Sequence, residues 1–345
     1  MSDVREITEL LGDGIAEELR KSLHSVAEAL PESYRFDTVD LSHENRKKGA
    51  RQLYDQAMES MKRTGIGIKY PTATVEESPN AVLRKLLKFS VIHRPVTTIP
   101  GIKTNFTGKI DLDIVRVATG GTYGDPGQMI GEYAAADLRV VDRRTCEQAA
   151  HYAFSIALQN RKSLTSSSKY TIQRVTDGLF EDIVDDVAEE FQFLGQIEHR
   201  RELFDALLAK LAMDPEQFQV VLVLNEYGYF LSDLASGLVG SLGLGASVSL
   251  SFNEKGRAEV AMFDASHGTA PDIAGEDKAN LTAILLAFSM LLKHIGNNRS
   301  ADALRGALFE CIGEGETTGD LGGSHGTVSF TQILLERVGS VWPGN

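Results

Sequence analysis

The alternation of helical patterns with short apolar runs is the sequence feature that most constrains the fold. Segments with apolar residues at helical spacing alternate with apolar runs of strand length that end near turn or polar residues. Such alternation favours a layered α/β architecture, because each helix must bury its apolar stripe against a neighbour. We expect helices over 17–29, 51–62, 80–87, 181–193, 202–212 and 281–295, and strands over 89–92, 110–117 and 220–224.

Composition limits the class of protein. The 345 residues suit two domains of ordinary size, and Cys146 and Cys311 lack metal-type spacing. No apolar run reaches the roughly 18 residues of a membrane span. The first residues lack a signal-peptide pattern, so we expect a cytoplasmic protein. A formal net charge of −13 argues against nucleic-acid and membrane partners, but permits a small polyanion bound by locally concentrated arginines.

Three arginines lie beside the predicted elements. Arg84 lies in a predicted helix, whereas Arg94 and Arg116 are expected to end strands. Guanidinium groups at such positions can converge in a cleft, where their planar forks match carboxylates. Each arginine alone is more often a surface residue, so the set of three carries the prediction of an anion site.

Two residues are candidates for proton transfer, and two for metal binding. Tyr123 lies in the glycine-rich segment 119–124, and Lys169 follows a serine-rich stretch. Both side chains carry protons poorly at neutral pH unless neighbours lower the pKa. Asp205, on a predicted helix, and Asp233, expected just after a strand, are carboxylates that suit Mg²⁺ or Mn²⁺. Packed or exposed side chains without a function are the plain alternative for all four.

The segment His267–Gly275 predicts a nucleotide site. Its glycine and proline residues allow close backbone approach to an adenosine, and Asp272 is placed to accept from ribose hydroxyls. An acid at that position repels a 2′-phosphate, which indicates NAD rather than NADP. The chain has no G-x-G-x-x-G after a strand. The spacing Gly240-x-x-Gly243-x-Gly245 is better explained by close helix packing.

Ordered motifs along nearly the whole chain resemble the isocitrate and isopropylmalate dehydrogenase family, the metal-dependent β-decarboxylating dehydrogenases, and most closely its NAD-type isocitrate enzymes. The resemblance is carried by Gly12–Ile15, Pro71–Thr74, Ser78–Asn80, Leu83–Lys85, Arg94–Val96, Arg116 with Tyr123, Lys169, Thr176–Phe180, Asn225-x-Tyr227-Gly228, Leu231–Asp233, Gly240–Gly243, His267–Gly275 and Asp320–Gly323.

The resemblance implies a two-domain α/β fold of the isopropylmalate dehydrogenase type, with a nucleotide site outside any Rossmann fold. Residues 1–98 and 253–345 would form the large domain, and 99–252 the smaller, dimer-forming one. Tyr123 would donate the proton after decarboxylation, and Lys169 would assist deprotonation of the hydroxyl from the partner subunit. The implied binding residues are Ser78, Asn80, Arg84, Arg94 and Arg116 for substrate, Thr72, His267, Gly268, Thr269, Ala270, Asp272, Ile273 and Asn280 for NAD, and Asp205 and Asp233 for Mg²⁺ or Mn²⁺.

The substrate class follows from the same comparison. Ser78 and Asn80 match the polar pair that receives a distal carboxylate in isocitrate enzymes, whereas 119–121 look like the isopropylmalate version of the next motif. We therefore expect NAD-dependent oxidative decarboxylation of a 2-hydroxy acid with a distal anionic group, isocitrate or a close analogue. A catalytically silent regulatory subunit of a heteromeric NAD-type isocitrate dehydrogenase is the alternative. The corresponding assemblies are a homodimer or a heteromer.

Several residues depart from the family pattern. Tyr229 replaces a metal-binding aspartate, which predicts weaker metal affinity. Thr171 replaces an asparagine near the nicotinamide, and Ala118 replaces a polar residue between Arg116 and Tyr123. The strand usually found before Gly12 is poor in apolar residues.

Overall fold

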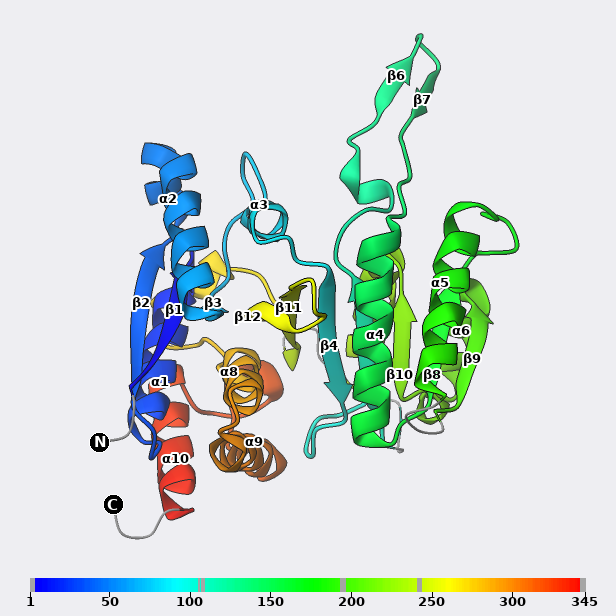
Figure 1. Cartoon of the computed structure of the whole chain (residues 1–345). Coiled ribbons are helices and arrows are strands. Elements are labelled where there is room, and N and C mark those ends of the chain that lie inside the picture. The colour runs from blue at the N-terminus through cyan, green and yellow to red at the C-terminus, as the bar shows by residue number, and fades with distance from the viewer. Residues whose placement is uncertain (1–3, 105, 107–108, 193–196, 241–243, 342–345) are drawn as a thin grey trace.

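One ten-stranded sheet forms the centre of the molecule (Figure 1). The computed structural model describes residues 4–104, 106, 109–192, 197–240 and 244–341. The strand order is β2-β1-β3-β12-β11-β4-β5-β10-β8-β9. The strands are β1 (Arg5–Leu11), β2 (Tyr34–Asp40), β3 (Ile66–Lys69), β4 (Val91–Thr97), β5 (Asp111–Val117), β8 (Leu164–Ser168), β9 (His199–Leu203), β10 (Val220–Val223), β11 (Ala246–Phe252) and β12 (Ala258–Ala265).

The sheet has two parallel parts joined by antiparallel strands. β2, β1, β3 and β12 are parallel to one another, as are β5, β10, β8 and β9. β11 and β4 pair antiparallel with their neighbours and connect the two parts. Loops that follow the parallel strands of one part therefore meet at one edge, where open α/β sheets bind their ligands.

Helices cover both faces of the sheet. α8 packs on β3, β11 and β12, and α4 packs on β4, β5, β8 and β10, whereas α2 and α3 cover the other face with a separate apolar cluster. The predicted apolar helix over 281–295 is confirmed as α8, whose side chains are mostly buried. The helices are α1 (Ala16–Glu28), α2 (His43–Thr64), α3 (Pro79–Leu86), α4 (Arg143–Asn160), α5 (Thr176–Phe191), α6 (Phe204–Met213), α7 (Asn225–Leu238), α8 (Thr282–His294), α9 (Asn298–Gly313) and α10 (Thr327–Ser340).

A two-stranded arm projects from the rest of the molecule (Figure 1). It consists of β6 (Gln128–Ile130) and β7 (Ala134–Ala136), which pair antiparallel. Apolar side chains of the arm are exposed: Met129 is 65% exposed and Tyr133 is 96% exposed. Exposed apolar side chains on a protruding hairpin indicate an interaction surface.

The segment before Gly12, which is poor in apolar residues, nevertheless forms the strand β1. Thr8 and Glu9 interrupt the apolar run, yet both are fully buried. The Glu9 carboxylate is 2.7 Å from Nε2 of His24 and accepts hydrogen bonds from Thr38 and Tyr70. These partners come from other elements, so a local pattern does not reveal them.

Three other element predictions need correction. The strand expected over 89–92 begins at Val91 and extends to Thr97, so Arg94 lies in its middle rather than at its end. Glu202, expected in a helix, belongs to β9, and α6 begins two residues later. Asp233, expected just after a strand, lies in the third turn of α7.

Three further sequence predictions concern the chain as a whole. The division into a domain of 1–98 with 253–345 and a domain of 99–252 stays a prediction. In the described part of the chain, no helix combines the length and apolar character needed to cross a membrane. Residues 241–243, which belong to two of the glycine motifs named in the sequence, lie outside the described residues, whereas Gly240 closely approaches the backbone of Lys103.

Candidate active site

Loops after β1, β3 and β12 meet in one compact cradle. A Cβ on Gly12 would lie 1.8 Å from the Pro71 carbonyl oxygen. Gly14 has φ +60° and approaches the Thr269 carbonyl equally closely. Ile15 N donates to that same carbonyl at 3.0 Å. Only glycine fits such contacts, so the motif at 12–15 packs these loops together.

Asp13 fixes the loop that contains Thr72. Its carboxylate accepts from the backbone N–H of Ala73 and of His43, both at 2.7 Å. Arg46 lies 3.5 Å from the same carboxylate and donates to the Ala73 carbonyl. The half-buried Thr72 is thus held next to the Gly12–Ile15 turn.

His267 presents an unpaired acceptor to this cradle. Its Nδ1 lies 2.9 Å from the Gly268 carbonyl, which requires a donating Nδ1–H and leaves Nε2 as an acceptor. Burial lowers the pKa of His267, so the ring is neutral at physiological pH. Nε2 is buried without a partner among the described residues. A buried acceptor without a partner indicates a donor on a ligand.

The rest of the predicted nucleotide segment lies beside His267. Ala270 has φ +41°, a conformation that L-residues rarely adopt and that often marks functional loops. Asp272 is exposed and Ile273 is half-buried. Asn280 is oriented by a bond to Asp320 and by the Thr282 N–H, so its side chain is fixed within the protein.

The three predicted arginines converge on the face of the sheet covered by α3 and α7. Arg116 is only 3% exposed. Burial lowers the pKa of Arg116 to about 10, and the positive charges of Arg84 and Arg94 contribute. Nε of Arg94 is buried without a partner among the described residues. Buried guanidinium groups that repel one another are stabilised by an anion placed between them.

Ser78 and Asn80, the polar pair predicted to bind the substrate, lie at the start of α3. Ser78 caps α3, with its hydroxyl accepting from Ala81 N at 3.4 Å. Asn80 is exposed in the first turn of the same helix. Both residues stay predicted substrate contacts.

Tyr229 occupies the centre of the arginine cluster. The Arg116 guanidinium lies 3.6 Å from the ring centroid of Tyr229. Burial raises the pKa of the Tyr229 hydroxyl, but the charges of Arg116 and Arg84 outweigh that effect, and the net pKa is lowered. The predicted proton donor, Tyr123, packs edge-on against Tyr229 at 5.2 Å and is 53% exposed. The site therefore has two adjacent phenols beside three cations.

The first turn of α7 connects these groups. Asn225 Oδ1 accepts from Nε of Arg116 at 3.0 Å, and its Nδ2 donates to the Gly120 carbonyl at 2.8 Å in the loop that contains Tyr123. Glu226 forms an ion pair with Arg139 and lies against Gly121, where a Cβ would be 1.8 Å from the carboxylate. The glycines at 120 and 121 thus approach protein groups, the Val140 carbonyl and the Glu226 carboxylate.

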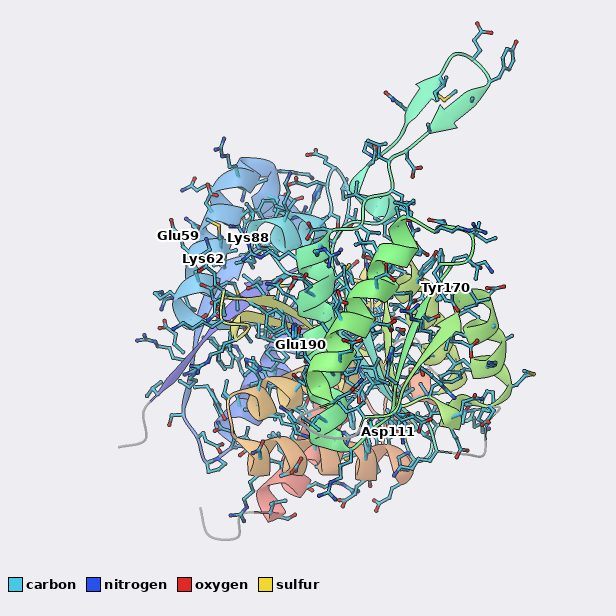
Figure 2. All side chains as sticks on the ribbon, turned by 45° about the vertical axis from the view of Figure 1, so that its right-hand side comes forward. Glu59, Lys62, Lys88, Asp111, Tyr170 and Glu190 are labelled. Carbon is cyan, nitrogen blue, oxygen red and sulfur yellow. The ribbon has the colours of Figure 1, made fainter. Side chains whose placement is uncertain are left out.

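Lys169 is held by a second network that begins on the same turn. Its ammonium pairs with Asp205 at 2.5 Å. Its backbone N–H donates to the buried Asp177, which also accepts from Tyr227 and Arg139, each at 2.8 Å. Figure 2 labels the neighbouring Tyr170, which follows β8, and Asp111, which begins β5, well apart from each other.

Lys169 lies in a different side-chain network from the arginine cluster. It follows β8, which is separated from the strand of Arg116, β5, by β10. Two strand spacings are about 10 Å. The Lys169 side chain pairs with Asp205, whereas Tyr123 packs against Tyr229 in the arginine cluster.

The predicted metal ligands do not form a metal centre within one chain. Asp205 is engaged with Lys169, Asp233 is exposed on α7, and Tyr229 is a phenol stacked on Arg116. Among the described residues, no three histidine, cysteine, aspartate or glutamate side chains form a group that could hold a metal ion.

Sequence reasoning missed Arg139 and the roles of Asn225 and Asp177. The side chain of Arg139 is only 13% exposed. The residues around it in the sequence show no helical or strand periodicity that would predict this burial. Asn225 and Asp177 stood out in the sequence only as motif members. The signal available in the sequence was a polar residue close to a glycine, Gly178 or Gly228.

Comparisons with known proteins agree with this geometry. The family model described as isocitrate/isopropylmalate dehydrogenase matches residues 6–338. A regulatory subunit of the NAD isocitrate dehydrogenase of Dictyostelium discoideum, named as mitochondrial, is 32% identical over 98% of this chain and 93% of its own length. The NAD isocitrate dehydrogenase catalytic subunit 6 of Arabidopsis thaliana, also named as mitochondrial, is 33% identical over 95% of this chain and 87% of its own length. The solved isocitrate dehydrogenase from Methylococcus capsulatus superposes with a TM-score of 0.88 at 32% identity, covering 97% of this chain and 99% of that one.

The fold and the site define the class of the β-decarboxylating hydroxy-acid dehydrogenases, which use NAD or NADP. This chain belongs to the isocitrate/isopropylmalate dehydrogenase family. The predictions of the family, of its α/β fold and of an NAD-dependent decarboxylating dehydrogenase are confirmed. The similar proteins include both a regulatory and a catalytic subunit.

Proposed function

We propose that this chain catalyses the NAD-dependent oxidative decarboxylation of a 2-hydroxy acid with a distal anionic group, with isocitrate as the first candidate. The observation that carries the proposal is the arginine cluster. Arg84, Arg94 and Arg116 are close enough for their charges to lower the pKa of Arg116, and Arg94 has a buried unpaired donor. A substrate with several carboxylates supplies the missing negative charge and accepts a hydrogen bond from Nε of Arg94.

The cradle formed by the loops after β1, β3 and β12 fits NAD. Nε2 of His267 offers a buried acceptor, and the close loop contacts at Gly12, Gly14 and Thr269 fix the backbone around it. Asp272, exposed at the rim, is suited to ribose hydroxyls and disfavours a 2′-phosphate. When bound there, NAD would accept the hydride from the hydroxyl-bearing carbon.

The chain's own residues supply binding and proton transfer. The arginines orient the carboxylates. As the hydride leaves carbon, the Lys169 ammonium relays the hydroxyl proton, giving one of its own protons to the paired Asp205 carboxylate as it takes up that of the hydroxyl. The bond to the carboxylate then breaks, releasing CO₂, and its electron pair remains on the substrate as an enolate. Tyr123, which is 53% exposed and packs against Tyr229, donates the proton that quenches the enolate. The phenol regains its proton from solvent.

Because Lys169 and the arginines lie apart in one chain, we propose that two chains complete each site. Lys169 of one chain would enter the site of its partner. The projecting arm supports a dimer, since the exposed Met129, Ile130 and Tyr133 need an apolar partner surface. A second copy of this chain or a related subunit fits this requirement.

We also propose that the dimer binds Mg²⁺ or Mn²⁺, but only weakly. A dimer can bring Asp205 of one chain toward Asp233 of the other, but Tyr229 contributes neither a carboxylate nor its charge. Hard divalent cations need several oxygen ligands, so we expect low affinity.

The test is the reduction of NAD by the purified chain, followed by NADH absorbance, with isocitrate, homoisocitrate, isopropylmalate and malate. Turnover with isocitrate or another distal-anion substrate is expected, and isopropylmalate should be the poorest. Arg94→Met should raise KM at least tenfold. Turnover independent of the distal anion would contradict the proposal.

A regulatory subunit is the second candidate, favoured by one observation. Tyr229 stacks on Arg116 and fills space beside the predicted substrate carboxylates. If the purified chain binds isocitrate but turns over nothing in the panel, and activity appears only with a second, catalytic subunit, the regulatory function replaces the enzymatic one.

A further inference from the structure

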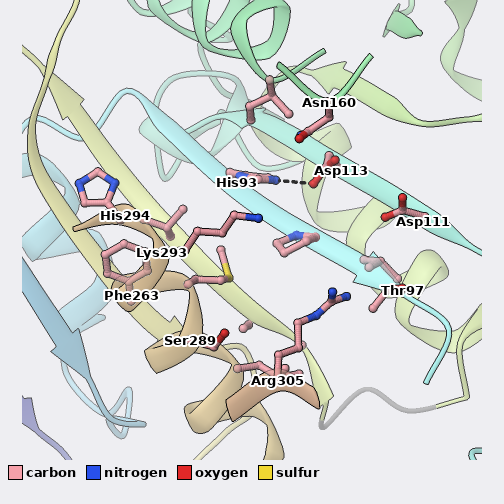
Figure 3. A pocket seen from close by; sticks show the side chains of 18 of the residues that line it. His93, Thr97, Asp111, Asp113, Asn160, Phe263, Ser289, Lys293, His294 and Arg305 are labelled. Atoms are coloured by element: carbon pink, nitrogen blue, oxygen red, sulfur yellow. Dashed lines mark hydrogen bonds and ion pairs between the residues drawn. The ribbon is translucent and has the colours of Figure 1, made fainter. Parts of the chain in front are cut away.

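A cavity of about 680 Å³ lies between α4 on one side and α8 and α9 on the other (Figure 3). Strands β4, β5 and β11 form its floor. Its volume falls within the range of about 300–1,000 Å³ in which proteins bind small organic molecules. Neither the substrate residues nor the nucleotide residues described above line it.

The cavity lies directly behind the arginine cluster. Successive residues of a strand point to opposite faces. On β4, His93 lines the cavity, so the next residue, Arg94, points to the other face. On β5, Asp113 lines the cavity, whereas Arg116 points to α7, where a Cβ on Gly228 would lie 2.4 Å from its side chain. Only the thickness of the sheet separates the two sites.

The acidic groups on the β5 wall are already neutralised. The Asp113 carboxylate accepts from Nε2 of His93 and from Nζ of Lys162, both at 2.8 Å. Lys162 also lies 3.0 Å from Asp111. Burial opposes ionisation of Asp113, but His93 and Lys162 outweigh it and lower its pKa to about 2. This wall therefore holds its charges in internal pairs.

The opposite wall has basic groups without such pairs. Within the described ranges, neither Lys293 of α8 nor Arg305 of α9 forms an ion pair, and Arg305 only stacks on Phe309 at 4.8 Å. Figure 3 shows both cationic heads directed across the cavity toward β4. Asp302, one turn before Arg305, is the acid of the lining that likewise has no ion-pair partner there. Because two cationic side chains face only one acid without an ion-pair partner, the cavity favours an anionic ligand.

Apolar side chains form most of the surface between the charged ends. Val96, Val248, Leu250, Phe263 and Met290 line the cavity from β4, β11, β12 and α8. An inorganic anion would leave this surface facing water. The lining therefore selects a molecule with both an anionic head and an apolar body.

We propose that this cavity binds a small organic anion with an apolar body, whose carboxylate or phosphate is held by Lys293 and Arg305. A molecule in this position touches helices from both parallel parts of the sheet, so it stabilises one separation of α4 from α8 and α9. Because β4 and β5 also carry Arg94 and Arg116, that separation affects the arginine cluster. The ligand thereby changes the affinity for the substrate anion, a second step that rests on the proposed function.

The test uses calorimetry on the full chain in the presence of NAD, so that the nucleotide site is filled. The probes are 1-naphthyl phosphate and octanoate, with inorganic phosphate and acetate as heads without an apolar body. The double variant Lys293→Met with Arg305→Met keeps the stems and removes the charges. The control variant is Lys255→Met with Arg257→Met, which removes one lysine charge and one arginine charge from the exposed turn between β11 and β12, outside the cavity.

We expect saturable binding of a long probe, at least tenfold tighter than its bare head, and at least tenfold weaker in the cavity variant but unchanged in the control variant. No saturable binding, or equal binding by the cavity variant, overturns the site. The dissociation constant of isocitrate is then measured with and without the saturating probe. A shift of threefold or more that is lost in the cavity variant supports the coupling, and an unchanged value refutes it. Absence of isocitrate binding under both conditions contradicts the proposed function, whereas the cavity is judged by the probe titration alone.

Discussion

Replacing Asp177 by asparagine tests whether the buried network behind Lys169 positions it. Asp177 is fully buried and accepts from Lys169 N, the Tyr227 hydroxyl and Arg139, at 2.7 to 2.8 Å. Asparagine keeps the shape, but it loses the charge and turns one acceptor into a donor. Breaking a buried pair costs about 3–5 kcal/mol, although Arg139 retains Glu226. We therefore expect Asp177→Asn to lower the free energy of unfolding by about 3 kcal/mol.

The assay combines urea unfolding with steady-state kinetics. Loss of the anchor at the Lys169 backbone should lower kcat at least tenfold with little change in KM, because the arginines are untouched. Asp186→Asn is the matched control, since Asp186 lies on the same helix, is exposed and pairs with Arg143 only at 4.0 Å. The control should cost less than about 1 kcal/mol. Equal effects of the two variants on stability, or equal losses in kcat and KM, would refute the reasoning.

Three further predictions concern the sites described above. Lys169→Met should abolish turnover while calorimetry finds nearly unchanged NAD affinity, and retained turnover would exclude the proton-transfer role. Tyr229→Asp should tighten Mn²⁺ binding measured by calorimetry, with Tyr229→Phe as the control; an unchanged affinity would show that another ligand already fills that position. Asp113 has a pKa lowered to about 2, so its stabilising effect is complete above about pH 4 and is lost as the pH falls to about 2. The unfolding free energy should fall by about 2 kcal/mol over that interval in the wild type and much less in Asp113→Asn, and equal pH profiles would contradict the assignment.

Local periodicity was sufficient for elements whose apolar face is continuous. The helix expected over 17–29 is α1, and the run over 220–224 is β10, each within a residue or two. The same reasoning failed at β1, where Glu9 is buried. Its stability depends on His24, Thr38 and Tyr70, which are brought near by the fold and not by sequence spacing.

For the site, too, some features could be predicted from the sequence and others could not. The convergence of the three arginines could be predicted, because motif order placed each at a strand or helix beside a cleft. The pairing of Glu226 with Arg139 could not, since the two residues are 87 positions apart and neither belongs to a periodic pattern. The separation of Lys169 from Arg116 depends on the strand order β5-β10-β8, which sequence order does not reveal. The cytoplasmic location and the domain boundaries stay predictions.

The projecting arm has a consequence for how stable this protein is in dilute solution. A two-stranded hairpin in water is marginally stable at best. β6 and β7 contribute no strand to the main sheet, and all six of their residues are exposed. The arm must therefore be stabilised by contacts with a molecule that covers it. If that cover is another protein chain, the melting temperature rises with protein concentration, and dilution loosens the arm before the rest of the chain unfolds.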